Sequence, residues 1–313
     1  VFLGAGDDGF YWLALEPTAD GQPRVLWHLD GDKFPDCESS PAVSEGVVYF
    51  GLGEGGFAIC AVDVLTGTQR WRIETPYPVF APPTVADGKL YVPTGNGNYV
   101  QSAADLLEMK LTILKDGGAS EQELSAARQR LKPAGEVWCV DLATQQVDWK
   151  FVADDAILGN VVRGEDSLYF GSRDEFLYRV SLDGRLLSKV HLREPLVCSP
   201  ALGRKHLYVT TTSGRLLCLD ALSLKPVWDG SLGVGENFVS SPIVAHGHVY
   251  VGTVQQGMCC LGQPGVPAAP LWSRGERGGQ ADEEPVPPPL SFAWQYPAEH
   301  ALRFDISAPL ISI

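Results

Sequence analysis

The sequence predicts an all-β fold built from repeated four-stranded antiparallel sheets, and three observations support this prediction. A pattern of four short apolar segments recurs along almost the whole chain, about every 40 residues. The segments are rich in β-branched and aromatic residues and are separated by Gly, Asp-Gly and Asn-Gly turns, which is typical of strands joined in hairpins. Each repeated sheet has two apolar faces that only neighbouring sheets can cover. Closing the sheets into a ring covers both, so we expect a β-propeller, with an open solenoid as the alternative.

The clearest copy of the repeat occupies residues 198–228. It opens with Ser199 and a proline before the first strand, and it carries Tyr208 in the second strand. The third strand ends at Asp220, and Trp228 lies in the fourth. Similar openings stand at Ser40, Pro82, Ser241 and Ala308, and similar tryptophans at Trp27, Trp71, Trp149, Trp272 and Trp294. Six copies are clear, so we expect six blades, with seven as the alternative.

The copies resemble the PQQ-like propeller repeat, whose blades typically read SPxV, then VYVG, then DGxLYALDxxTGxxxW. Residues 62–67 (VDVLTG) and 141–144 (DLAT) are close matches to the Asp-x-x-Thr-Gly corner of that family. The resemblance covers nearly the whole chain and implies a propeller. It does not imply one activity, because the repeat occurs in quinoprotein dehydrogenases, in an outer-membrane assembly lipoprotein, in sensor domains of Ser/Thr kinases and in scaffolds.

We expect residues 1–313 to form a single propeller domain. Residues 1–29 supply only three strands of a blade, and residues 306–313 have the pattern of a first strand. Strands from both termini would then complete one blade and close the ring, a usual device in propellers.

Two segments interrupt the repeats. Residues 99–134, in the third copy, carry two helical patterns with N-cap signals at Ser102 and Ser120, so we expect a helical hairpin between the second and third strands. A lid, a partner-binding arm and neutral decoration are its open roles. Residues 274–290 are acidic and Pro-rich and predict a surface linker. Trp272 and Trp294 lie close to this linker and compete for the fourth strand of the last copy.

The composition excludes some partners and favours one compartment. A formal net charge of −14 disfavours binding to nucleic acid through bulk electrostatics. No apolar run approaches the length of a membrane span, and no signal-peptide pattern opens the chain. Seven cysteines without disulfide spacing favour reduced thiols. We therefore expect a cytoplasmic protein, or an extracytoplasmic one if an export signal lies upstream of Val1.

No catalytic residue, metal ligand or cofactor-binding residue is predicted. Adjacent cysteines would suit the quinoprotein alcohol dehydrogenases that the repeat resembles, since these hold their cofactor against a vicinal disulfide. However, Cys260 occupies the position two residues before the corner Asp. In most other copies this position holds a small residue, namely Ala14, Ala61, Cys139 or Cys218, and in one copy it holds Arg179. We therefore interpret Cys259 and Cys260 as buried apolar residues. His246 and His248 are interpreted as turn residues.

Polar residues in the loops predict a binding face. In a propeller, the loops between second and third strands lie at the same end as the connections between blades. Loops on a rigid scaffold concentrate binding residues, although Asp and Asn are also common in turns for backbone reasons. We expect a protein partner or a small ligand to bind at this end, which also bears the hairpin: Asp7, Asp8, Glu54, Asn96, Asn98, Arg173, Asp174, Arg303 and Asp305.

Three functional interpretations follow. The first is a non-catalytic propeller that binds a protein or ligand, as a sensor or scaffold domain of a larger protein. The second is a quinone-dependent oxidoreductase. The third is an envelope assembly scaffold similar to the outer-membrane lipoprotein. The first is preferred because the repeats are clean and carry no catalytic constellation; the preference rests on the resemblance, since fold alone does not determine function.

Overall fold

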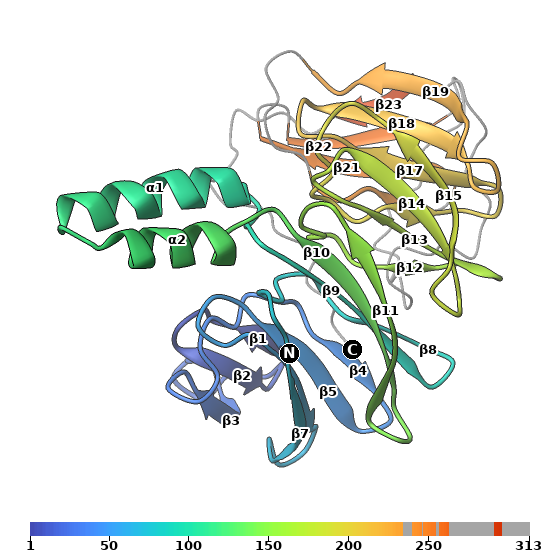
Figure 1. Cartoon of the computed structure of the whole chain (residues 1–313). Helices are drawn as coiled ribbons and strands as arrows, with labels where there is room; N and C mark the ends of the chain where they lie inside the picture. Colours follow the sequence, from blue (N-terminus) through green and yellow to red (C-terminus); the bar gives the residue numbers. More distant parts are fainter. Residues whose placement is uncertain (234–239, 246, 255–256, 263–290, 296–313) are drawn as a thin grey trace. The chain divides into compact units, whose positions relative to one another are not determined.

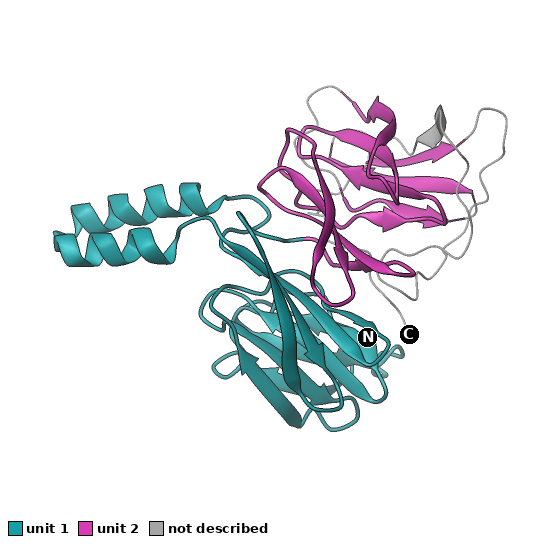
Figure 2. Ribbon diagram, turned by 45° about the vertical axis from the view of Figure 1, so that its right-hand side comes forward, with its two compact units in different colours: residues 1–158 teal, residues 159–313 magenta. Residues whose placement is uncertain are grey.

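The computed structural model describes five stretches of the chain: residues 1–233, 240–245, 247–254, 257–262 and 291–295. The chain divides into two compact units, residues 1–158 and 159–313 (Figure 2). Each unit contains three antiparallel sheets. The described residues therefore form six sheets of three or four strands, which confirms the mostly β prediction and agrees with six blades.

The first unit contains the sheets β1-β2-β3, β4-β5-β6-β7 and β8-β9-β10-β11 (Figure 1). Its strands are β1 (Phe2–Gly4), β2 (Gly9–Leu13), β3 (Val25–Asp30), β4 (Ala42–Ser44), β5 (Val47–Leu52), β6 (Ala58–Asp63), β7 (Gln69–Glu74), β8 (Thr84–Ala86), β9 (Lys89–Gly95), β10 (Gly135–Asp141) and β11 (Gln146–Ala153). Two helices follow β9 and precede β10: α1 (Ala103–Asp116) and α2 (Glu121–Arg130).

The second unit contains three four-stranded sheets in simple chain order. Its strands are β12 (Val162–Arg163), β13 (Ser167–Gly171), β14 (Phe176–Ser181), β15 (Leu186–His191), β16 (Ala201–Leu202), β17 (His206–Thr210), β18 (Arg215–Asp220), β19 (Pro226–Ser231), β20 (Ile243–Ala245), β21 (His248–Thr253), β22 (Gly257–Gly262) and β23 (Ser291–Gln295).

A row of a tyrosine, a small residue and a tryptophan crosses the sheets at one register and explains the repeat. In the sheet β16-β17-β18-β19, Tyr208 pairs with Cys218 and Cys218 with Trp228, after which the ladder shifts register. The same row and shift recur as Tyr49–Ala61–Trp71, Tyr91–Cys139–Trp149 and Tyr250–Cys260–Trp294. The small residue leaves room for the tyrosine and tryptophan rings to meet across it, with centroids 5.8 Å apart for Tyr49 and Trp71.

The first sheet departs from this row, and the prediction of Ala14 at its small position is wrong. The structure pairs Trp12 with Trp27 at the equivalent point, and the register shift follows Trp12. The physical reason is packing: Trp12 stacks on Phe2, with centroids 5.7 Å apart, so aromatic rings fill the whole row.

Arg179 holds the same position in the sheet β12-β13-β14-β15, where it pairs with Ser188 instead of a tryptophan. In this sheet the large residue, Arg179, lies in the third strand and the small one, Ser188, lies in the fourth strand, the reverse of the other sheets. The Arg179 guanidinium is buried, and its Nη1 donates to the Leu222 carbonyl oxygen in the next sheet at 2.9 Å. Trp27 makes the comparable bond in its own unit, from Nε1 to the Val64 carbonyl oxygen at 2.9 Å. Arg179 thus replaces a repeat tryptophan in bonding to the corner of the following sheet.

The last sheet takes its fourth strand from residues 291–295. β23 carries Trp294 and pairs with β22, with Cys260 opposite Trp294 and the usual register shift after it. Residues 263–290 therefore separate the third and fourth strands of this sheet, which accounts for the extra length of the last copy. Trp272, the other candidate for this strand, and the predicted linker 274–290 lie outside the described residues, as does the predicted closing strand 306–313.

The core of each unit lies between the faces of its sheets. In the first unit, Phe10 of β2 stacks on Phe50 of β5 with ring centroids 4.3 Å apart, and both side chains are fully buried. Leu177 of β14 and Leu217 of β18 belong to a comparable cluster in the second unit. The serines of the Ser-Pro openings add polar links: Asn160 N donates to Ser199 Oγ, and Ser199 N donates to Ser241 Oγ, each at 2.9 Å. Apolar faces and one repeated hydroxyl therefore join consecutive sheets.

Candidate functional site

The helical hairpin α1–α2 is the candidate functional site, and its caps explain why it forms. Ser102 and Asp105 make a complete capping box on α1, and Ser120 and Glu123 make one on α2, as the N-cap signals predict. Each helix has basic side chains in its last turn, where their positive charge interacts favourably with the negative end of the helix dipole. Both helices are therefore defined by local sequence.

Asn96, at the end of β9, fixes the base of the hairpin. Its side-chain amide donates to the carbonyl oxygens of Arg130 at 2.8 Å and Lys132 at 2.7 Å, where the chain leaves α2. Its backbone N donates to the Ala134 carbonyl oxygen at 2.9 Å. Asn96 is only 5% exposed, so this predicted binding residue is an anchor of the hairpin.

A cation–π contact fastens the same base to the neighbouring sheet. The Arg130 guanidinium lies over the Phe57 ring, 5.3 Å from its centroid, and Phe57 precedes β6. Asn98 orders the other side of the base, since its Oδ1 accepts from Val100 N at 2.9 Å and from Gln101 N at 2.7 Å. The hairpin is thus held at one end of the first unit, and its remaining length carries most of its exposed residues.

α1 exposes apolar side chains that α2 does not cover. Leu106 is buried, but Met109 and Ile113, which follow it at spacings of three and four residues along the same stripe, are 49% and 58% exposed. α2 contributes a single buried apolar residue, Leu124. The short and polar second helix therefore shields only part of the apolar surface of the first.

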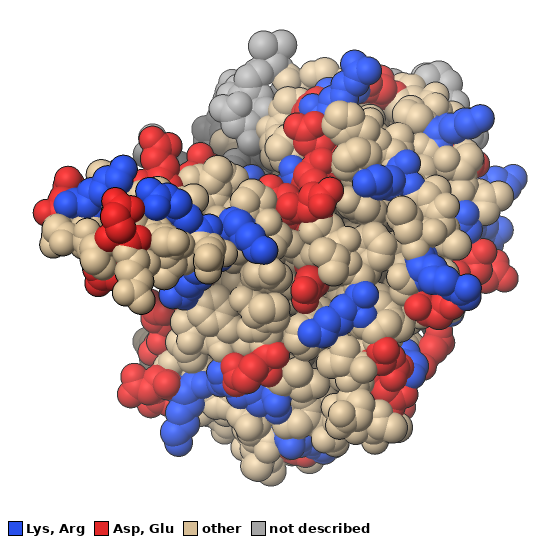
Figure 3. All heavy atoms as spheres, in the orientation of Figure 1, with Lys and Arg blue, Asp and Glu red and all other residues tan. Residues whose placement is uncertain are grey.

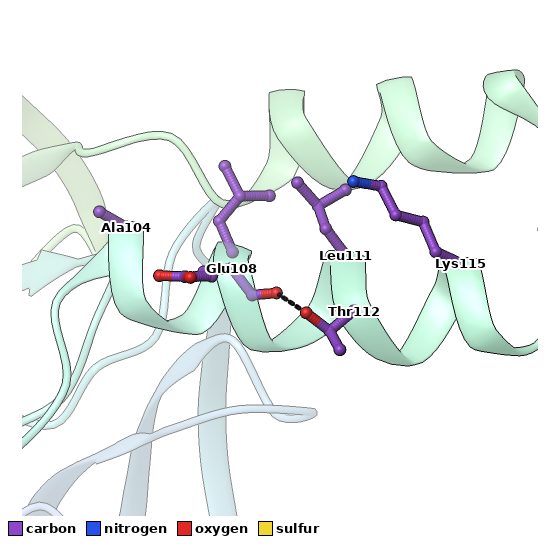
Figure 4. A pocket seen from close by; sticks show the side chains of 6 residues that line it. Ala104, Glu108, Leu111, Thr112 and Lys115 are labelled. Carbon is purple, nitrogen blue, oxygen red and sulfur yellow. Dashed lines mark hydrogen bonds between the residues drawn. The ribbon is translucent and has the colours of Figure 1, made fainter.

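Two shallow grooves run along α1. One is lined by Asp105, Glu108, Met109, Thr112 and Ile113. The other is lined by Ala104, Leu107, Glu108, Leu111, Thr112 and Lys115 (Figure 4). Thr112 is held in place by its hydroxyl, which donates to the Glu108 carbonyl oxygen at 3.0 Å. Charged groups of both signs lie beside uncharged surface on the hairpin (Figure 3).

The predicted binding residues of the first unit lie in separate loops and mostly serve their own backbone or that of a neighbour. Asp8 accepts from the Tyr11 hydroxyl at 2.6 Å, and its carbonyl oxygen lies 2.7 Å from His28 Nε2. Asp7 follows β1, and Glu54 follows β5. Glu54 N donates to the Asp36 carboxylate. Both Glu54 and Asp7 lie close enough to Asp36 to raise the pKa of its carboxyl.

The remaining predicted residues belong to the second unit. Asp174 closes a tight turn: its carboxylate accepts from Phe176 N at 3.0 Å and from the Tyr178 hydroxyl at 2.5 Å. Arg173 precedes it in the same turn before β14. Arg303 and Asp305 lie outside the described residues. The binding face as a whole therefore stays a prediction, while the turn role of Asp174 is clear.

Asp36 is the ionisable residue that sequence reasoning missed. It lies in the connection between the first two sheets at φ +54°, and burial together with nearby Glu38 raises its pKa to about 6. Gly53 is the residue that reflects this packing, because a Cβ at position 53 would lie only 2.3 Å from the Asp36 carboxylate. That signal needs the fold to be read, since the two residues belong to different segments.

The cysteines do not form the pocket that quinoprotein dehydrogenases would require. All seven are buried and none forms a disulfide, and Cys259 and Cys260 lie opposite different residues of β21, Val251 and Tyr250. Burial raises the pKa of the Cys260 thiol, which leaves it unreactive. Among the described residues, no three His, Cys, Asp or Glu side chains gather as a metal site needs. Within the described ranges, no residues can be assigned to a quinone held with calcium.

Comparison with known proteins identifies the family. A family model of PQQ repeats, described as outer membrane protein assembly factor BamB, matches residues 14–110 and 173–283, which is more than half of the chain. The chain belongs to this family. The BamB match covers repeat copies in both units and confirms the resemblance to PQQ-like propeller repeats. No curated protein matches the chain in sequence.

Many solved structures are similar to the chain, among them the two that follow. The crystal structure of BamB from Moraxella catarrhalis aligns with a TM-score of 0.60 at 13% identity, covering 86% of this chain and 68% of that one. A computationally designed protein, Ika8, aligns with a TM-score of 0.57 at 11% identity, covering 83% of this chain and 67% of the designed one. At such low identity the likeness establishes the fold, a BamB-like β-propeller. No helix within the described ranges is long and apolar enough to cross a membrane.

Proposed function

We propose that this BamB-family propeller is a non-catalytic binding domain, part of a larger protein, and that its helical hairpin is the arm that contacts a protein partner. The observation that carries the proposal is the exposed stripe of α1. Met109 and Ile113 remain about half exposed, although burying such side chains is worth about 1.5–3 kcal/mol each. An anchored helix that presents apolar residues has the form of a helical recognition element.

The anchoring of the hairpin at its base favours a partner-binding role over an insertion without a function. Asn96 and the Arg130–Phe57 contact tie the exit of α2 to β9 and to the neighbouring loop. Ordering a helix in advance lowers the entropic cost of binding, because less freedom is lost when the partner docks. An arm held in this way presents the same apolar stripe in every molecule.

A photo-crosslinking residue placed at position 113 tests the proposal. The protein is illuminated in an extract of the cells that produce it, and the crosslinked partner is identified and purified. We expect crosslinks from position 113 and none from position 222, where Leu222 is 67% exposed on the other unit. The partner should then bind the unmodified protein and lose affinity for the Met109→Gln/Ile113→Gln variant. Equal crosslinking from both positions would contradict the proposal.

An envelope assembly role is the second candidate, and the family match favours it. The family carries the name of an outer membrane assembly factor, and the crystal structure of BamB shares the fold. This role predicts an export signal and a lipid-attachment cysteine in the gene upstream of Val1, and a membrane-bound protein on cell fractionation. The first candidate predicts neither, and recovery of the native protein in the cytoplasmic fraction would decide for it.

A further inference from the structure

We propose that the groove beside Met109 and Ile113 receives an amphipathic helix of the partner whose apolar side is flanked by Lys and Arg. This inference rests on the proposed function of the hairpin and adds the chemistry of the partner. Three features of the groove support this inference: its apolar lining, the ridge of side chains that α1 presents, and the negative sign of its charges.

The apolar lining of the groove consists of Met109 and Ile113, which continue the stripe that begins at the buried Leu106. Leu106, Met109 and Ile113 follow one another at helical spacing, and exposure rises from 8% at Leu106 to 58% at Ile113. The opposite stripe is different, because Leu107 and Leu111 are already half-buried. The free apolar area therefore lies on the Met109 side, and it widens away from the anchored base.

The shape of the groove favours a helix as its occupant. Side chains three and four residues apart form ridges along a helix, and a second helix packs its own ridges into the spaces between them. α1 offers such a ridge but no free backbone edge, since all but its terminal peptide groups are bonded within the helix. A partner strand would find no hydrogen-bond partners here.

The charges of the groove select a basic partner. Its charged lining consists of two carboxylates, Asp105 and Glu108, with no cation. Glu108 forms no ion pair within the described residues, so its charge is available. The groove on the Leu107 side is different, because Lys115 accompanies Glu108 there. Lysine or arginine beside the apolar residues of the partner would complement the Met109 groove.

A membrane surface is disfavoured by the same charges. Anionic lipids attract clusters of Lys and Arg next to apolar side chains. The Met109 groove presents carboxylates, and the whole chain carries a formal net charge of −14. Its apolar residues would therefore approach an anionic bilayer against electrostatic repulsion.

Three designed helical peptides of about 18 residues test the proposal. The first has a leucine side flanked by lysines, the second replaces each lysine with glutamate, and the third keeps the lysines but replaces each leucine with glutamine. Each is titrated into the full chain by fluorescence anisotropy at about 0.1 M salt. We expect saturable binding of the first peptide only, weakened by added salt.

Variants of the protein locate the binding. Met109→Gln/Ile113→Gln should weaken the leucine–lysine peptide by about tenfold or more, and Glu108→Gln by about threefold. Leu222→Gln, on the other unit, should leave binding unchanged. Equal binding of the glutamate peptide, equal binding to all variants, no binding of the leucine–lysine peptide, or capture of the protein by phosphatidylglycerol vesicles would each overturn the proposal. If the peptides fail but the crosslinked partner still requires Met109 and Ile113, the hairpin keeps its function and only the partner chemistry is wrong.

Discussion

Asp36 gives the first unit a specific dependence on pH. Its pKa is raised to about 6, from an ordinary value of 3.8, chiefly by burial. A carboxyl whose pKa rises on folding favours the protonated form in the native state. Its ionised form therefore destabilises the fold above pH 6, and this penalty disappears as the pH falls from about 6 to 4.

We expect Asp36→Asn to raise the free energy of unfolding at pH 7 by roughly 1 kcal/mol, a value reduced because the carboxyl is partly exposed to solvent. The Asn oxygen can still accept from Glu54 N. Urea unfolding at pH 7 and pH 4 checks this, with Glu16→Gln as an exposed control. A gain that is the same at both pH values would contradict the assigned burial.

In the row where the other sheets have a small residue and a tryptophan, one sheet has Arg179 and Ser188, and substitutions at these two positions test whether they share one space. Arg179→Cys removes bonds to Ser167 Oγ and to the Leu222 carbonyl oxygen, and should lower the free energy of unfolding by about 1–3 kcal/mol. Adding Ser188→Trp restores the row of the other sheets and should recover most of that loss. Urea unfolding of both single variants and the double variant measures the coupling. Additive effects would show that the two positions do not share one space.

The hairpin shows how far a local pattern can be read from sequence. Its helices and capping boxes follow from residues close together along the chain, so Ser102 and Ser120 could be identified directly. The sequence predicts Asn96 on a binding face because it lies in a loop at the end of the propeller where binding residues concentrate. Its partners lie more than 30 residues away, at Arg130 and Lys132, and no local pattern encodes them.

Asn96→Ala should loosen the hairpin while the strands keep their protection. The carbonyl oxygens of Arg130 and Lys132 lose their side-chain donor, which frees the end of α2. Hydrogen–deuterium exchange is the measurement: amides of residues 103–131 should exchange about tenfold faster or more, and those of β5 and β6 should not change. Gln129→Ala, an exposed residue of α2 that is not part of the base, is the matched control. Uniform loss of protection across the unit would mean that Asn96 supports the sheets instead.

At the scale of the whole molecule, the repeat predicts the number of sheets. Strands in its irregular copies are harder to assign from the sequence. Six sheets follow from periodicity because each copy carries its own strands and turns. The fourth strand of the last sheet could not be assigned between Trp272 and Trp294, because a long insertion separates it from β22. The mistaken Ala14 has a related cause: aromatic packing in the first sheet replaces the small residue that the other copies share.

Closure of the ring by residues 306–313 and the cytoplasmic location stay predictions. The first sheet has three strands, and β1 forms its edge. Deleting residues 306–313 should lower the Tm by about 5 °C or more if this segment supplies the missing strand. Calorimetry of the truncated chain, beside a chain with all eight residues changed to Gly and Ser, checks it. An unchanged Tm in both would remove the closing strand.

The most direct test of a separable binding arm is a chain that lacks residues 102–131, in which nine residues connect β9 to β10. Its thermal unfolding and its affinity for the crosslinked partner are measured on one preparation. We predict a cooperative transition with a Tm within a few degrees of the intact chain, because the sheet β8-β9-β10-β11 pairs without the helices, and loss of partner binding. Loss of the cooperative transition, or full binding without the hairpin, would contradict the account.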